Sequence, residues 1–209
     1  MDKDKLMIGL TVLLALVILF NQYQLSSFGG SLNLGGTSIS ATDVIPKGVP
    51  TIYGQELSIS YDGVSVNNPQ LADATLAKMV VFDNSITLTG DKLQRYINIG
   101  LQISCEYCCG AESVIFKNGR AACGCAHSQA MRGIAKYLID KHADEFTDDQ
   151  ILGEMGKWKV LSFPGIHQQK AAVLEQKGIE LNYINLASNK YRGIEKGATS
   201  SGGSMVGGC

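Results

Sequence analysis

Five of the six cysteines and one of the three histidines of this 209-residue chain lie within one short segment, Cys105–His127. Cysteine thiolates and histidine imidazoles are the groups that hold zinc in proteins, with sulfur about 2.3 Å from the ion. The candidate ligands form two groups, which can converge on one ion if the chain turns between them. They are Cys105, Cys108, Cys109, Cys123, Cys125 and His127. The segment therefore predicts a metal site, with zinc as the expected metal.

The pair Asn118-Gly119 lies between two short apolar runs, which is typical of a β-hairpin because both residues tolerate a positive φ. Such a hairpin would return the chain to the first group of cysteines. A helix is predicted on each side of the segment. The first begins near Gly90 and runs into Cys105, and the second spans residues 128–142. The positive end of this second helix would favour thiolates over thiols.

The order of a cysteine turn, a hairpin and a helix resembles the treble-clef class of zinc-binding domains. The resemblance spans residues 105–142 and implies that Cys105 and Cys108 form the zinc knuckle. The second half of the site would then come from Cys123, Cys125 and His127.

Two further resemblances concern shorter motifs. Cys123-Gly124-Cys125 is similar to the core of exported, membrane-anchored bacterial proteins named for a Pro-Cys-Tyr-Cys-Gly-Cys motif. The chain as a whole resembles archaeal single-pass membrane proteins of unknown function, which carry Cys-Glu-Tyr-Cys-Cys-Gly and Cys-Gly-Cys-Ala-His-Ser at this separation. Neither resemblance implies a known activity.

Six candidate ligands exceed the four positions of a tetrahedral zinc site, so several alternatives stay open. The surplus would suit a binuclear site, an iron–sulfur cluster for electron transfer, or a disulfide beside a metal. Structural disulfides alone would explain clustered cysteines outside the cytoplasm. A redox role would use Cys105 and Cys108 as a thiol–disulfide pair, with Cys109 or Cys209 as the resolving cysteine. The sequence shows no nucleophile–base pair and no phosphate-binding loop, which leaves enzymatic activity open and favours a non-enzymatic role.

Residues 1–25 are predicted to be a cytoplasmic start followed by a single transmembrane anchor. Leu6–Phe20 contains no charged residue; two lysines precede it, and the next basic residue is Lys47. This excess of positive charge places the N-terminus in the cytoplasm and the rest of the chain outside the cell membrane. A cleaved signal peptide has a similar length but normally ends in a small-x-small cleavage site, which is not visible here. A buried helix is the third alternative.

Three regions are predicted after the anchor. Residues 26–42 are rich in serine and glycine, which is typical of a flexible linker. Residues 43–196 are predicted to form an extracytoplasmic α+β domain, rich in helices and built around the cysteine-rich β-hairpin. Residues 197–209 have too few apolar side chains to bury a core and are expected to be disordered. This tail contains Cys209, whose thiol could reach the cysteine cluster or form an intermolecular disulfide.

Further elements are predicted from capping and turn signals. They are helices that begin near Pro69 and Thr147, a helix over residues 166–177 ended by Gly178, and short strands near residues 57–61 and 179–184. The start at Thr147 has the strongest signal, because Thr147 and Gln150 match a capping box. Trp158 and Tyr137 are expected in the core, whereas His142 and His167 are expected to face solvent.

The overall charge limits the classes of partner. A net charge of −1 and 18% charged residues exclude a strongly basic protein, so no nucleic-acid partner is expected. Glu106 and Glu112 flank the cysteines without a visible partner for acid–base catalysis. We therefore expect a membrane-tethered, extracytoplasmic, zinc-binding domain with a structural, interaction or metal-handling role.

Overall fold

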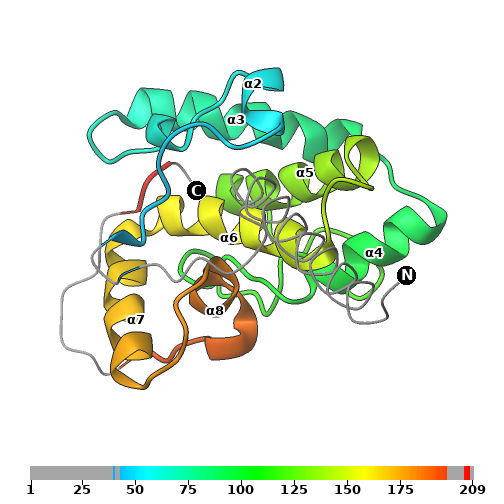
Figure 1. Ribbon diagram of the computed structural model, residues 1–209. Coiled ribbons are helices and arrows are strands. Elements are labelled where there is room, and N and C mark those ends of the chain that lie inside the picture. The colour runs from blue at the N-terminus through cyan, green and yellow to red at the C-terminus, as the bar shows by residue number, and fades with distance from the viewer. Residues whose placement is uncertain (1–39, 41–42, 197–204, 208–209) are drawn as a thin grey trace, which may run out of the picture. The chain divides into compact units, whose positions relative to one another are not determined.

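The computed structural model describes residue 40, residues 43–196 and residues 205–207. Over this part of the chain the protein is built from helices, as Figure 1 shows. The α-helices are α2 (Tyr53–Glu56), α3 (Pro69–Ser85), α4 (Gly90–Gly100), α5 (Ala126–Lys141), α6 (Asp148–Ser162), α7 (Pro164–Gln176) and α8 (Tyr183–Ala187). The described 3-10 helices are η2 (Tyr61–Gly63) and η3 (Asn189–Tyr191).

The helices begin where side chains can satisfy the first backbone N–H groups. The Asn68 side chain accepts a hydrogen bond from a backbone N–H of α3, and Pro69 occupies the first turn of that helix. Thr147 precedes α6 and forms the predicted capping box with Gln150. Helix α7 ends just before Gly178, which has the positive φ expected of a helix stop. These boundaries confirm the predictions made from the capping residues.

The predicted α+β fold was wrong, because the described residues contain no strand or sheet. The chain does turn at Asn118-Gly119, where Gly119 has a φ of 80°. The two arms of the turn, however, meet only in an isolated bridge between Ile115 and Ala121. Val114 precedes Ile115 in the first arm. Its N–H donates to the backbone carbonyl oxygen of Ile103, in the segment before the cysteines. The treble-clef hairpin is therefore not formed as a pair of strands in the described part of the chain.

The strands predicted near residues 57–61 and 179–184 were also wrong. The first segment leads into η2, and the second leads into α8. Asn182 explains the second error, because its side chain accepts a hydrogen bond from the N–H of Asn185 and so starts a helix. Here a capping residue outweighs the alternating apolar pattern around it.

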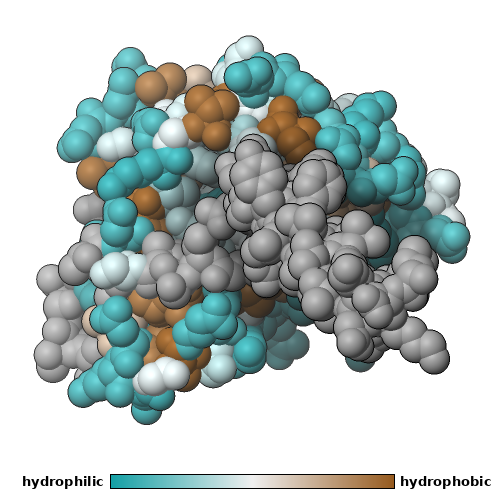
Figure 2. Space-filling view, viewed as in Figure 1, coloured by the Kyte–Doolittle hydropathy of each residue, from teal (hydrophilic) through white to brown (hydrophobic). Residues whose placement is uncertain are grey.

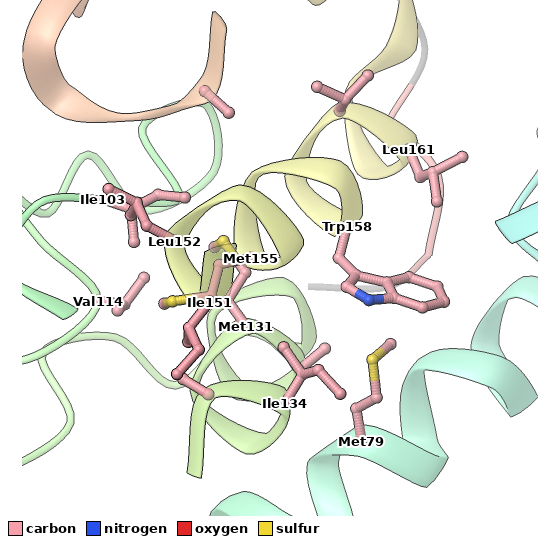
Figure 3. Close-up of a cluster of buried hydrophobic side chains, with 14 of the residues drawn as sticks. Met79, Ile103, Val114, Met131, Ile134, Ile151, Leu152, Met155, Trp158 and Leu161 are labelled. Carbon is pink, nitrogen blue, oxygen red and sulfur yellow. The ribbon is translucent and has the colours of Figure 1, made fainter. Parts of the chain in front are cut away.

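The core lies where α5 packs between α3 and α6 (Figure 1). Trp158 of α6 is fully buried, as predicted, and Figure 3 shows its indole beside Met79 of α3 and Ile134 of α5. The indole N–H donates to the Tyr53 hydroxyl over 3.0 Å, so the polar atom of this buried ring has a partner. Tyr137, also expected in the core, is only half-buried.

The face of the molecule in Figure 2 is largely hydrophilic, with hydrophobic residues in separate patches. No helix in the described part of the chain is long and apolar enough to cross a membrane. Residues 1–25, where the anchor was expected, lie outside the described residues, as does nearly all of the predicted linker over residues 26–42.

Gly133 allows α5 to approach α3 closely. A Cβ atom at this position would lie 1.9 Å from the Met79 carbonyl oxygen, which belongs to the backbone and cannot rotate aside. We expect Gly133→Ala to lower the free energy of unfolding by about 1–3 kcal/mol or more, because the two helices must move apart. Urea denaturation of the full chain measures the effect.

Gly153→Ala is the matched control, because Gly153 lies inside α6 and a Cβ there would meet no atom within 4 Å. Alanine favours a helix over glycine by about 0.5–1 kcal/mol, so this variant should be at least as stable as the wild type. Equal destabilisation by the two substitutions would contradict the close contact between α3 and α5.

Candidate metal and thiol site

All six predicted ligands lie in the segment that leads from α4 into the first turn of α5. Helix α4 ends at Gly100, earlier than predicted, so Cys105 follows in an irregular stretch and not at a helix end. Cys125 is the N-cap of α5, and its sulfur accepts a hydrogen bond from the N–H of Ser128 over 3.4 Å. His127 lies in the first turn of the same helix. The turn between the two groups of ligands brings them together.

One group of ligand atoms is compact enough to hold a metal ion. It consists of Cys105, Cys108, Cys125 and His127, whose ligand atoms all lie within 4.8 Å of one another. The sulfur atoms of Cys105 and Cys125 are 3.6 Å apart. Two thiolates about 2.3 Å from one tetrahedral ion lie about 3.8 Å from each other, so the observed spacing fits a single ion. Cys108 is half-buried and the other three residues are buried.

His127 is oriented as a metal ligand would be. Its Nε2 lies 2.8 Å from the backbone carbonyl oxygen of Val206. A carbonyl only accepts hydrogen bonds, so Nε2 carries a proton, and Nδ1 is the ring nitrogen that can bind a metal. Nδ1 is buried and has no hydrogen-bond partner among the described residues. Metal-binding histidines usually donate their second ring N–H to a carbonyl or carboxylate, which is the arrangement here.

Val206 belongs to the tail, residues 197–209, that the sequence predicts to be disordered. Residues 205–207 are the described part of this tail. The Val206 side chain is 3% exposed, and its N–H donates to the Ser162 carbonyl oxygen over 2.9 Å. Figure 1 shows this stretch beside the end of α6. The Val206 side chain and the two hydrogen bonds of its backbone help to hold residues 205–207 against the domain.

A second group of sulfur atoms belongs to Cys109, Cys123 and Cys125, and it contains a disulfide. Cys109 and Cys123 form a disulfide, and the Cys125 sulfur lies 3.5 Å from the Cys123 sulfur. These three residues could also hold a metal ion, but only with the disulfide reduced. Cys108 is disulfide-bonded as well, whereas Cys105 and Cys125 are free thiols. The predicted redox pair of Cys105 and Cys108 is therefore not joined in this structure.

A hydrogen bond joins the Cys105 and Cys125 sulfur atoms. It lowers the pKa of Cys125 to about 3, against the opposing effect of burial and with help from His127 and Ser128. The same hydrogen bond, together with burial, raises the pKa of Cys105 well above its usual value. The opposite shifts favour the thiolate at Cys125 and the thiol at Cys105.

A buried ion pair adjoins the cysteines. Lys159 of α6 lies 3.1 Å from a carboxylate oxygen of Glu106 and donates to the Ala187 carbonyl oxygen over 2.8 Å. Burial lowers the pKa of Lys159 to about 8, although Glu106 and Cys105 act to raise it. Sequence analysis missed this partner of Glu106. The signal that could have indicated it is a lysine beside Trp158 on a helix face that is otherwise apolar, because a buried lysine needs a carboxylate.

Other polar side chains extend the ion pair into a buried network. Tyr107 donates to Glu195 over 3.3 Å, and His167 Nδ1 donates to the Phe163 carbonyl oxygen over 2.8 Å. Burial lowers the pKa of His167 well below its usual value, so the ring is neutral. The prediction that His142 and His167 face solvent was wrong, since both are buried. Several buried atoms of the network have no hydrogen-bond partner among the described residues, namely Glu106 Oε1, His167 Nε2, Lys170 Nζ and Glu195 Oε2.

The geometry of the cluster indicates a metal or thiol site without indicating a protein family. Comparisons of the chain with family models, curated proteins and solved structures find no match. The resemblances to the bacterial Pro-Cys-Tyr-Cys-Gly-Cys proteins and to the archaeal single-pass proteins therefore stay predictions.

Removal of Lys159 would leave Glu106 buried without its nearest counter-charge. We expect Lys159→Met to lower the free energy of unfolding by about 3–5 kcal/mol. The double variant Lys159→Met with Glu106→Gln removes both charges, so it should recover a large part of this loss. Urea denaturation of the two variants and the wild type measures both effects. A double variant no more stable than Lys159→Met would contradict the ion pair.

Proposed function

We propose that this chain binds one zinc ion in the buried cluster between α4 and α5. The ligands are Cys105, Cys108, Cys125 and His127. The observation that carries the proposal is the orientation of His127. The Val206 carbonyl oxygen accepts a hydrogen bond from Nε2. Nδ1 is buried and has no hydrogen-bond partner among the described residues. The ligand atom of His127 lies within 4.8 Å of the three cysteine sulfurs. A buried, unpartnered nitrogen costs free energy, and a coordinated metal ion offsets that cost.

Zinc fits these donors better than a four-iron cluster does. Mixed cysteine and histidine ligands in a tetrahedral array are usual for structural zinc. In a four-iron cluster each cysteine binds a different iron, so the cysteine sulfurs lie farther apart than they do on a single ion. The distance of 3.6 Å between the Cys105 and Cys125 sulfurs matches the single ion.

The charges around the cluster also support an anionic zinc site. Three thiolates and one Zn²⁺ carry a net charge of −1, which needs compensation in a buried place. Lys159 is close enough to Cys105 for their charges to interact. Cys125 is the N-cap of α5 and receives the N–H of Ser128, so the positive end of the helix acts on its sulfur. Both contributions favour thiolates.

The ion would serve as a structural cross-link or as the cargo of metal handling. It would tie the irregular segment after α4 to the first turn of α5, and its binding would then contribute directly to folding. Ligation requires Cys108 as a thiolate, so the disulfide at Cys108 has to be reduced before zinc can bind there.

Metal analysis of the reduced, anaerobically purified full chain tests this proposal. We expect about one zinc per chain and no visible absorbance, because zinc is colourless. Chelation should lower the melting temperature, since zinc binds the folded state. His127→Ala and Cys125→Ser should each lose most of the bound zinc.

The control is the double variant Cys109→Ser with Cys123→Ser, which leaves all four proposed ligands in place and should keep its zinc. A metal-free chain with every thiol reduced would contradict the proposal. Visible absorbance accompanied by iron would replace zinc with an iron–sulfur cluster. Loss of zinc from the control variant would shift the site to the second group of cysteines.

A second candidate function is thiol–disulfide exchange, which the position of Cys125 favours. Its sulfur lies 3.5 Å from Cys123, which is bonded to Cys109. Attack of the Cys125 thiolate on the Cys123 sulfur would form a new disulfide and release Cys109 as a thiolate, with no net change in electrons. Cys123 also lines an open pocket of about 540 Å³ that contains basic side chains, which gives a small thiol or disulfide access to it.

Insulin reduction in the presence of dithiothreitol tests the exchange function. If Cys125 is the attacking thiolate, Cys125→Ser should reduce the rate to that of dithiothreitol alone, because the 3.5 Å approach is lost. Cys108→Ser is the control and should retain the activity, because it leaves Cys125 and the disulfide of Cys109 with Cys123 in place. Full activity of Cys125→Ser, or no activity of the wild type, would exclude this candidate.

A further inference from the structure

The open pocket that Cys123 lines has an excess of positive charge. Its volume of about 540 Å³ is within the range of small-molecule sites, about 300–1,000 Å³. Its charged lining residues are Asp83, Arg120, Arg132 and Lys136. Three cations and one carboxylate give the lining a net charge of +2. A ligand that carries carboxylates would therefore be attracted to this pocket.

Two of these cations share the one carboxylate. Arg132 is 2% exposed, and its Nε and Nη2 donate to Asp83 Oδ2 over 2.9 and 2.6 Å. Lys136 Nζ lies 3.0 Å from the other carboxylate oxygen of Asp83. One carboxylate neutralises only one of the two cations, so this fixed cluster keeps one positive charge. Arg120 is exposed and adds the second.

Arg132 also positions Cys123 in the wall of the pocket. Its Nη1 donates to the backbone carbonyl oxygen of Cys123 over 2.8 Å and to that of Val114 over 3.2 Å. The same buried guanidinium therefore holds both the carboxylate and the cysteine. Cys123 is half-buried and forms the disulfide with Cys109. A disulfide cysteine and an excess of positive charge thus line the same open space.

We propose that this pocket binds a small thiol that carries carboxylates and that this thiol reacts with Cys123. The inference rests on thiol–disulfide exchange, our second candidate function, and it names the substrate class of that function. Arg120 and Lys136 would pair with the carboxylates of the ligand. The positive charge would also favour the thiolate of the ligand, which is the attacking form. A neutral thiol lacks the first attraction, and a cationic thiol is repelled.

The reaction at Cys123 is an exchange, so its electrons balance without an oxidant. The thiolate of the ligand attacks the Cys123 sulfur and forms a mixed disulfide with it. The bond between Cys109 and Cys123 breaks, and Cys109 leaves as a thiolate. Cys109 is exposed, so this thiolate can take up a proton from water. A second molecule of the small thiol then attacks the mixed disulfide, frees Cys123 and departs as a small-molecule disulfide.

Reduction of the full chain by three small thiols tests the substrate class. Mercaptosuccinate carries two carboxylates, 2-mercaptoethanol is neutral and cysteamine is cationic. The measured rate is the appearance of an alkylatable Cys109 thiol, followed by mass spectrometry after an acid quench and corrected for the rate without reagent. We expect Arg120→Gln to lower the rate with mercaptosuccinate by about two- to fivefold, the scale of one exposed ion pair. The rate with 2-mercaptoethanol should not change.

Lys117→Gln is the matched control, because Lys117 is an exposed cation of the same turn that is not among the residues lining the pocket. It should leave the rates with all three thiols unchanged. Arg120 takes part in the turn through its backbone N–H and carbonyl groups, so Arg120→Gln keeps these hydrogen bonds. An equal fall with all three thiols, an equal effect of Lys117→Gln, or a mixed disulfide on Cys109 in place of Cys123 would overturn the proposal.

Succinate carries two carboxylates and no thiol, so it separates binding from exchange. Its titration at constant ionic strength is followed by the amide NMR shifts of the residues that line the pocket. We expect saturable shifts in the wild type and a Kd about two- to fivefold higher in Arg120→Gln. Succinate binding to a chain that none of the three thiols reduces would contradict the exchange function alone. Reduction that is insensitive to Arg120→Gln, without succinate binding, would overturn this inference alone.

Discussion

The candidate site depends on the burial of helix α5 between α3 and α6. Gly133 lets α5 approach the backbone of α3 closely, and this contact fixes the position of α5 against α3. Its first turn carries Cys125 and His127, so core packing positions half of the proposed ligands. The other half comes from the irregular stretch after α4, which has no helix or strand of its own to hold Cys105 and Cys108. A bond through a metal would supply the constraint that secondary structure does not provide there.

Charged and polar groups around the sulfur atoms also affect whether the proposed site can bind a metal. Lys159 and Glu106 place a buried ion pair beside Cys105, and such a pair is costly unless its charges are compensated. An anionic zinc–thiolate site would interact favourably with the lysine. The tail adds a second influence, because Val206 fixes the tautomer of His127. Cys108 can bind a metal only as a thiolate, so its oxidation state decides whether all four proposed ligands are present.

Local signals in the sequence predicted most of the helices correctly. Asn68 before Pro69, the Thr147 capping box and Gly178 act through their own neighbours, so they need no tertiary contact to work. The spacing of the cysteines around a turn was also sufficient to predict that the ligands converge. The same local reasoning failed where two signals competed, as at Asn182, whose cap overrode an alternating pattern.

The sequence by itself therefore determined the helices that begin at strong caps and the set of residues that could bind a metal. Only the tertiary structure decided which of these residues share one site and in which protonation state. The Lys159–Glu106 pair spans 53 residues, and the His127–Val206 hydrogen bond spans 79. Neither contact leaves a periodic pattern in the sequence. Burial in a common core creates them, because each polar group taken from water requires a partner wherever the chain can supply one.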